Sequence, residues 1–175
     1  MEGRRAVFCF GVKRKGSMNF REVRRKDRVL EDEPARRLLE AGEYGFLAMG
    51  SPEGYGYGIP MSYAADGERI YFHCAPEGHK LDAIREDGRV SFCVVGRTQV
   101  IPHQFTTAYE SVHVFGRIEI VEDEAERLHA LRLLVAKYSP EYRETAEKYI
   151  AASSRRTCVL RLDIEHLSGK CKRVK

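Results

Sequence analysis

Segment 71–80 carries the residues best suited to binding an anion, because an apolar run ends there and a helical pattern begins. The N–H groups at a helix start bind anions, and Gly78 permits close approach of the backbone. Lys80 falls in the first helical turn, where the positive end of the helix dipole disfavours a cation. A bound anion would compensate both the lysine charge and the dipole. The pattern therefore indicates a phosphate site at Gly78, His79 and Lys80. A solvated lysine at a helix start explains it equally well.

Two histidines of this segment, His73 and His79, raise the question of a metal site. His73 and Cys74 are neighbours on a predicted strand and so point to opposite faces, and no fourth ligand has metal spacing. We therefore expect no zinc site. A histidine at a strand end most often makes structural hydrogen bonds, and the alternative is that His73 lines a ligand pocket.

Two further segments have free polar groups to offer. Pro60 lies inside a predicted strand, which indicates a sheet edge or a bulge with unpaired backbone groups. Such groups could pair with the edge of a planar heterocycle, although an ordinary edge strand gives the same pattern. Segment 104–111 is predicted to be a loop between two strands, and its hydroxyl groups could bind phosphate or a polyol chain.

Apolar periodicity and turn signals predict the elements that hold these segments. A helix is expected from Glu31, with Asp32 as its cap and Gly42 beyond its end. Further helices are predicted at 78–86, 123–138 and 140–152, and strands at 45–50, 57–64, 69–74, 89–95, 109–121 and 157–166. About six strands joined by hairpin signals favour an antiparallel sheet or small barrel with flanking helices, a mainly β or α+β fold.

The composition is that of one ordinary soluble domain. The chain has 175 residues, of which 43% are hydrophobic and 32% charged, and no apolar run approaches the ~18 residues of a membrane span. The five cysteines form no Cys-x-x-Cys pair, which disfavours a disulfide framework and a zinc ribbon. Reduced thiols in the cytoplasm are expected, with no membrane partner.

The basic residues gather at the ends of the chain. Residues 1–30 hold ten lysines and arginines against three acidic residues, and the middle of the chain is acidic. A solvated arm explains this better than a nucleic-acid site. Residues 1–17 are interpreted as a non-native or disordered leader, and residues 18–175 as a single domain that begins at Met18.

In order along the chain, several sequence blocks resemble the pyridoxamine 5′-phosphate oxidase-like, FMN-binding split-barrel superfamily, and within it the nitroimidazole-resistance proteins. Each block is weak alone, and together they span residues 18–170. The blocks lie at 20–26, 59–63, 70–74, 78–84, 90–95, 105–107, 111–112, 115–116, 137–140 and 164–170.

This resemblance implies a six-stranded antiparallel split β-barrel that forms a homodimer with FMN at the subunit interface. His73 is implied to be catalytic, as a proton donor or a substrate-positioning group. The implied cofactor-binding residues are Pro60, Met61, Ser62, Tyr63, Phe72, His73, Cys74, Gly78, His79, Lys80, Ser111 and Val112. Glu110 stands where an arginine is common in the family, which would weaken binding of the phosphate.

The function implied is an FMN-dependent oxidoreductase that passes electrons from a reduced nicotinamide to a small acceptor such as a nitroaromatic compound. The flavin would carry the redox chemistry. The alternative is a flavin- or haem-binding protein without turnover, for which His73, His79, His103 and His113 are available as axial ligands. Oxidation of pyridoxamine phosphate is a third candidate function. It ranks below the other two because the sequence blocks resemble the nitroimidazole-resistance proteins.

Overall fold

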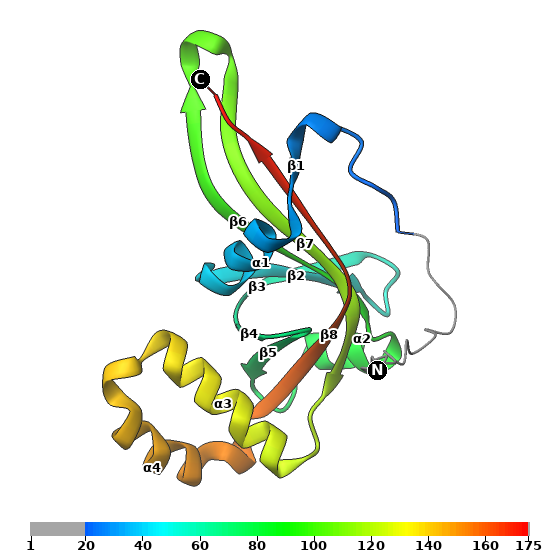
Figure 1. Cartoon of the computed structure of the whole chain (residues 1–175). Helices are drawn as coiled ribbons and strands as arrows, with labels where there is room; N and C mark the ends of the chain where they lie inside the picture. The colour runs from blue at the N-terminus through cyan, green and yellow to red at the C-terminus, as the bar shows by residue number, and fades with distance from the viewer. Residues whose placement is uncertain (1–19, 175) are drawn as a thin grey trace, which may run out of the picture.

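The computed structural model describes residues 20–174, and Figure 1 shows a strongly curved antiparallel sheet with helices against it. The predicted leader at 1–17 lies outside the described residues. The strands are Val29–Leu30 (β1), Tyr44–Gly50 (β2), Gly56–Ser62 (β3), Ala64–Asp66 (β4), Arg69–Cys74 (β5), Arg89–Ile101 (β6), Thr106–Ile120 (β7) and Cys158–Lys172 (β8). The α-helices are Asp32–Ala41 (α1), His79–Glu86 (α2), Glu124–Tyr138 (α3) and Arg143–Ser153 (α4).

The sheet order explains how a barrel arises. The strands pair antiparallel in the order β3-β2-β6-β7-β8-β5-β4, and β1 pairs with β8. The first and last strands of this path, β3 and β4, are separated in the chain by Tyr63 alone. The sheet therefore curls until its two edges meet end to end, without hydrogen bonds closing the ladder. This confirms the split-barrel class and the prediction that Pro60 lies on an edge strand.

The predicted strand count of six is too low for two physical reasons. The predicted strand at 57–64 is divided at Tyr63, because the chain there crosses from one sheet edge to the other. β1 has only two residues, too few for alternation to show in the sequence.

Alternating side chains of the long strands fill the barrel. Strand β2 buries every second residue, and the same alternation recurs along β6, β7 and β8. The largest fully buried side chains come from β2, β5, β6, β8, α2 and the residue between β3 and β4: Tyr63, Tyr71, Phe72, Phe92, Leu47, Ile70, Leu81, Leu160 and Leu162. A core built from both sheet edges is what holds the open barrel together.

Tyr63 and Tyr138 form the seam between the two edges. The Tyr63 N–H donates to the Tyr138 hydroxyl at 2.9 Å, and that hydroxyl lies within hydrogen-bonding distance of the Tyr63 and Glu43 carbonyl oxygens. The Tyr63 hydroxyl donates to the carbonyl of Leu39 in α1. One buried tyrosine thus joins β3, β4, α1 and the end of α3.

Lys137 covers the same seam with a cation. Its Nζ lies 3.8 Å from the centre of the Tyr63 ring and has no hydrogen-bond partner among the described residues. Burial lowers the pKa of Lys137 from 10.5 to about 8. The ring quadrupole therefore compensates only part of the cost of burying this ammonium group.

Acidic side chains fix the N-terminal end of α3. Asp123 caps the helix by accepting the Glu126 N–H at 2.7 Å. The Glu126 carboxylate accepts from the Tyr71 hydroxyl at 2.9 Å and from Arg161 at 3.0 Å. Partial burial acts to raise the pKa of Glu126, but these hydrogen bonds outweigh it and the pKa is lowered. The helix is therefore tied to β5 and β8 at its first turn.

Two local predictions are corrected. Asp32 lies inside the first turn of α1 and pairs with Arg36 instead of capping the helix. Gly42 has φ −61°, so no left-handed cap requires glycine. Its small size is what matters, since a Cβ there would lie 2.4 Å from Val94 and 2.6 Å from the Tyr63 hydroxyl.

The segment predicted as a hydroxyl-rich loop, 104–111, is mostly strand. β6 continues to Ile101, a 3₁₀ turn spans Pro102–Gln104, and β7 begins at Thr106. Thr106 and Thr107 are β-branched and suit a ladder, where they pair with Ile101 and Val100. β6 and β7 thus form a long hairpin arm, drawn at the top of Figure 1. None of the described helices is long and apolar enough to cross a membrane.

Replacing Tyr138 with phenylalanine is expected to destabilise the fold by about 1–3 kcal/mol, because the seam loses its shared hydroxyl and leaves backbone groups of Tyr63 unpaired. Urea unfolding of the two proteins measures this difference. The matched control is Tyr142→Phe, since Tyr142 is 66% exposed. Equal stability of the two variants would contradict the role of the seam hydroxyl.

Lys137→Met is expected to change how stability depends on pH. The folded protein releases the Lys137 proton near pH 8, whereas the unfolded chain keeps it to about 10.5. The unfolded state therefore binds more protons in this window, and wild-type stability should rise with pH relative to the variant, by about 1–3 kcal/mol in total. Denaturant unfolding at pH 7 and pH 10.5 tests this. Lys148→Met serves as the control, and a difference that stays constant with pH would refute the assignment.

Candidate functional site

A cavity of about 430 Å³ lies between the ends of two barrel strands and the α3–α4 pair. Ser62, the last residue of β3, and His73, near the end of β5, form its barrel side. The helical side and the floor come from α3, α4 and the segments after them: Leu131, Leu134, Val135, Tyr138, Ser139, Tyr149, Ile150, Ser153 and Thr157. The structure thus brings together two residues predicted for the site, 62 and 73, on either side of the seam.

Several polar groups of the cavity are already satisfied by the protein. The Tyr138 hydroxyl holds the seam, the Ser153 hydroxyl donates to the Tyr149 carbonyl at 2.7 Å, and Thr157 donates to the Ser153 carbonyl at 3.1 Å. Within residues 20–174, no side-chain hydrogen bond engages the hydroxyls of Ser62, Ser139 and Tyr149 or the ring of His73. These groups are the ones that a ligand can use.

His73 is held in its neutral form. Burial lowers the pKa of its imidazole below 6.5, and the nearby Lys80 ammonium lowers it further. At neutral pH the ring therefore offers one N–H donor and one acceptor nitrogen. Lys80, a residue of the predicted anion site, thus acts electrostatically on His73.

The backbone at Gly78 and the start of α2, here called the cradle, has a conformation that suits the predicted anion site. Gly78 has φ +125°, a conformation that favours glycine, and no atom lies within 4 Å of the position of a Cβ there. Its carbonyl accepts the Leu81 and Asp82 N–H groups, at 2.8 and 3.4 Å. The N–H groups of His79 and Lys80, the first two residues of α2, have no backbone acceptor in the part of the chain described here. Both are free for an anion, and the residues present fit a phosphate group.

The His79 side chain contacts other residues of the protein. Its ring packs edge-on against Tyr57 with centroids 4.5 Å apart, and its Nε2 lies 3.6 Å from a Glu53 carboxylate oxygen. The imidazole therefore braces the start of α2 against β3 and its preceding turn. Only the backbone N–H of His79 remains for the cradle.

Four predicted cofactor-binding residues direct their side chains into the core. Tyr63, Phe72 and Val112 are fully buried and Met61 is nearly so, all within the barrel core. They can offer a ligand only backbone groups. Pro60 is exposed on the edge strand, in agreement with its predicted position.

Cys74 lies directly opposite Cys158 in the β5–β8 ladder, and both thiols are free. Burial raises the pKa of Cys158 to about 11, and the neighbouring Cys74 thiol contributes to the shift. The Cys158 thiol is therefore neutral at pH 7. Cys74 packs half-buried against the core instead of facing the cavity beside His73.

Ser111 and Val112 lie far from His73 within one chain. Ser111 pairs with Lys170 of β8, whereas His73 pairs with Val159, eleven residues earlier on that strand. At ~3.3 Å per residue, this separates the two positions by ~35 Å along the strand. Ser111 and Val112 therefore pair with the end of β8 opposite to the end that pairs with His73.

Glu110 has a structural partner that the sequence did not reveal. Its carboxylate accepts the Arg97 N–H at 3.3 Å, beside the irregular register between Val95 and Thr98. The acidic side chain thus caps a bulge in the hairpin arm and lies next to the distant Ser111, away from the cradle.

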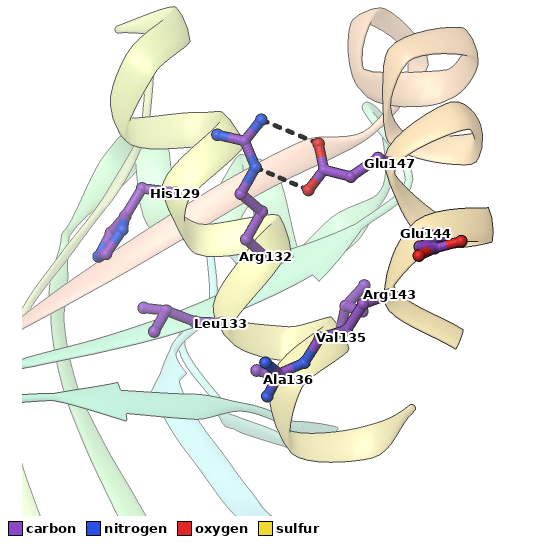
Figure 2. Close-up of a pocket in the computed structure, with 8 residues that line it drawn as sticks. All are labelled: His129, Arg132, Leu133, Val135, Ala136, Arg143, Glu144 and Glu147. Carbon is purple, nitrogen blue, oxygen red and sulfur yellow. Dashed lines mark hydrogen bonds and ion pairs between the residues drawn. The ribbon is translucent and has the colours of Figure 1, made fainter. Parts of the chain in front are cut away.

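A second hollow lies on the other side of the helix pair (Figure 2). Two of its polar residues already satisfy one another, since Arg132 makes a two-point ion pair with Glu147 at 2.8 and 2.9 Å. Figure 2 shows this pair spanning α3 and α4. The groove therefore serves to fasten the helices, and it contains none of the predicted site residues.

The helical wall of the cavity was missed by sequence reasoning. Tyr138 and Ser139 were noted only within the predicted helix and the block at 137–140, without a role in the site, and Tyr149 and Thr157 were not singled out. The one available signal was the exposed Tyr149 in a predicted helix, because a large aromatic side chain on a polar helix face has little structural reason to be there.

Comparisons with known proteins agree with this geometry. A candidate 5-nitroimidazole antibiotic resistance protein from Bacteroides thetaiotaomicron has a TM-score of 0.68 at 21% identity, covering 82% of this chain and 86% of that one. An FAD-binding protein from Mesorhizobium loti has a TM-score of 0.62 at 25% identity, covering 83% and 98%. An FAD and haem binding protein from Mycobacterium smegmatis has a TM-score of 0.68 at 22% identity, covering 82% and 72%.

No curated protein sequence matched the chain. The family model described as pyridoxamine 5′-phosphate oxidase matches residues 31–171, from the start of α1 almost to the end of β8. That match covers most of the chain and includes both the cradle and the cavity. The protein belongs to the pyridoxamine 5′-phosphate oxidase family.

Proposed function

We propose that the protein is a flavin-dependent oxidoreductase that binds FMN. The observation that carries this proposal is the placement of an anion cradle, formed by Gly78 and Lys80, beside a neutral His73 at the mouth of an apolar cavity. A single phosphate cradle suits FMN, which has one phosphate. The resemblance of the fold to a protein described as FAD-binding supports a flavin as the cofactor class.

Residues of the cradle and the cavity have roles in this proposal. The His79 and Lys80 N–H groups and the Lys80 ammonium would hold the phosphate, and the exposed edge at Pro60 and Ser62 would pair with a planar ring. When bound, the flavin supplies the transfer of a hydride or electrons. His73 would hold and donate a proton to the acceptor. Electrons would come from a reduced nicotinamide, with a nitroaromatic compound as acceptor.

The site is completed by a second copy of the chain in this proposal. Ser111 and Val112 resemble flavin-contacting residues of the family, yet in the same chain Ser111 lies ~35 Å from the position of His73, measured along β8. A partner subunit in a homodimer would supply them. Exposed apolar side chains on neighbouring strands favour such an interface: Tyr44 and Phe46 of β2 and Val95 of β6 are 63%, 50% and 62% exposed. Sedimentation of the flavin-loaded protein as a 20.0 kDa monomer would contradict this arrangement.

The second candidate is a flavin- or haem-binding protein without turnover, as suggested by the similar fold of the FAD and haem binding protein. A Soret band in the absorption spectrum of the purified protein would favour it over the flavin enzyme. We place either protein in the cytoplasm, because the facing thiols of Cys74 and Cys158 remain unpaired.

Lys80→Ala is expected to weaken FMN binding about 10- to 150-fold, because it removes one charge-assisted hydrogen bond to the phosphate, ~1.5–3 kcal/mol. Fluorescence titration of FMN with the purified proteins measures the affinity. Lys148→Ala, an exposed lysine on α4, is the matched control and should bind FMN like the wild type. Unchanged affinity of the Lys80 variant would remove this lysine from the phosphate site.

His73→Ala is expected to retain FMN and to slow reduction of the acceptor, on the order of 100-fold if the ring donates a proton. The conservative variant His73→Gln keeps a hydrogen-bond donor without a titrating proton. The wild-type rate should change with pH below 6.5, where the lowered pKa of His73 lies, and the glutamine variant should lose that dependence. Wild-type turnover in both variants would leave His73 a structural role.

A further inference from the structure

We propose that the cavity between His73 and the α3–α4 pair, here called the helical cavity, is the acceptor site and selects flat, uncharged aromatic molecules over phosphorylated ones. The description of this cavity as an acceptor site rests on the proposed function, whereas the binding test below does not require turnover. It departs from the substrate after which the family is named, pyridoxamine 5′-phosphate.

The helical cavity has the size and floor of a small-molecule site. Its volume of about 430 Å³ falls within the ~300–1,000 Å³ typical of ligand pockets. The floor is formed by Leu131, Leu134 and Ile150, which are buried side chains, and by half-buried Val135. Tyr149 is 73% exposed and therefore lies at the rim, where its ring can cover a flat ligand.

The charge of the lining sets the selectivity. No aspartate, glutamate, lysine or arginine is among the described residues that line the helical cavity. The one titratable imidazole, His73, is neutral at pH 7 because of burial and of Lys80. An anion entering this space would lose its hydration and find no charged side chain in the lining to pair with, which is unfavourable. Lys80 is a lining residue of the cradle, not of this cavity.

The free polar groups lie around the apolar floor. The Ser62 and Ser139 hydroxyls and the His73 ring come from three different segments, and no hydrogen bond within residues 20–174 engages them. They can donate to a small polar group of an aromatic ligand, such as the oxygens of a nitro group. An apolar floor with neutral donors at the edge suits a neutral nitroaromatic molecule.

The α4 helix forms one wall and is attached by few contacts. Ile150 is its one buried residue, and the Arg132–Glu147 pair fastens it to α3 from the opposite side (Figure 2). Residues of α4 that line the helical cavity can thus be changed with little effect on the barrel core. This separation gives clean test variants.

The experiment is calorimetric titration of the full chain, before and after loading with FMN, with nitrobenzene and with 4-nitrobenzoate, which adds one negative charge to the same ring. Nitrobenzene is expected to bind at least tenfold more tightly. Tyr149→Ala, at the rim, should weaken nitrobenzene binding at least fivefold, whereas Tyr142→Ala, equally exposed but outside the lining, should leave it unchanged.

A second pair of variants tests the interior. Ser153→Phe fills the helical cavity from α4 and should abolish nitrobenzene binding, whereas Ala136→Phe adds the same ring to the groove of Figure 2 and should not. Both should bind FMN like the wild type. The proposal is overturned if 4-nitrobenzoate binds as well as nitrobenzene, if the paired variants behave alike, or if Ser153→Phe weakens FMN equally, since the cavity would then hold the flavin. If the wild type binds nitrobenzene, Ser153→Phe does not, and neither protein binds FMN, the result supports the site and refutes the flavin proposal.

Discussion

The whole structure depends on how the barrel closes at Tyr63. A sheet that curls on itself without a closing ladder leaves backbone polar groups unpaired where its two edges meet, and buried groups of this kind must find partners. The Tyr138 hydroxyl provides them for Tyr63, and the Tyr63 hydroxyl in turn reaches the end of α1. Closure therefore uses one side chain from α3 and one backbone carbonyl from α1. Both act at Tyr63, the single residue between the two edge strands.

This closure also explains the helical cavity. Helix α3 is pinned at its end by Tyr138 and at its start by the Glu126 contacts to Tyr71 and Arg161. The two attachments lie about 18 Å apart along the helix, at a rise of ~1.5 Å per residue. The buried middle of the helix, at Leu131 and Leu134, faces Ser62 and His73 across a space that neither attachment can close. The cavity is thus a consequence of fixing α3 at both ends.

Much of the fold could be predicted from the sequence because its signals are local. Proline in segment 59–63 identified the edge strand, and alternation identified β8. Predictions failed where long-range geometry decides. The division at Tyr63 depends on a contact to a residue 75 positions away, and segment 104–111 forms strand because the arm of β6 pairs with it. Among the predicted site residues, alternation along β5 would have separated inward Phe72 from outward His73, but which cavity His73 faces depends on α3 and α4.

The same barrel accommodates different ligands because its inward strand residues form the core, whereas residues at the strand ends and on the helix pair can contact a ligand. The related folds are described as binding FAD, or FAD and haem, or as conferring resistance to an antibiotic. Inward residues of the strands, such as Phe72, are committed to the core and to closure, so they can vary little. Residues that end the strands or lie on the helix pair, such as Ser62, His73 and Tyr149, are not needed for core packing or for closure. The barrel therefore fixes where a ligand can bind, and the uncharged lining of the helical cavity, not the fold, decides which molecule it accepts.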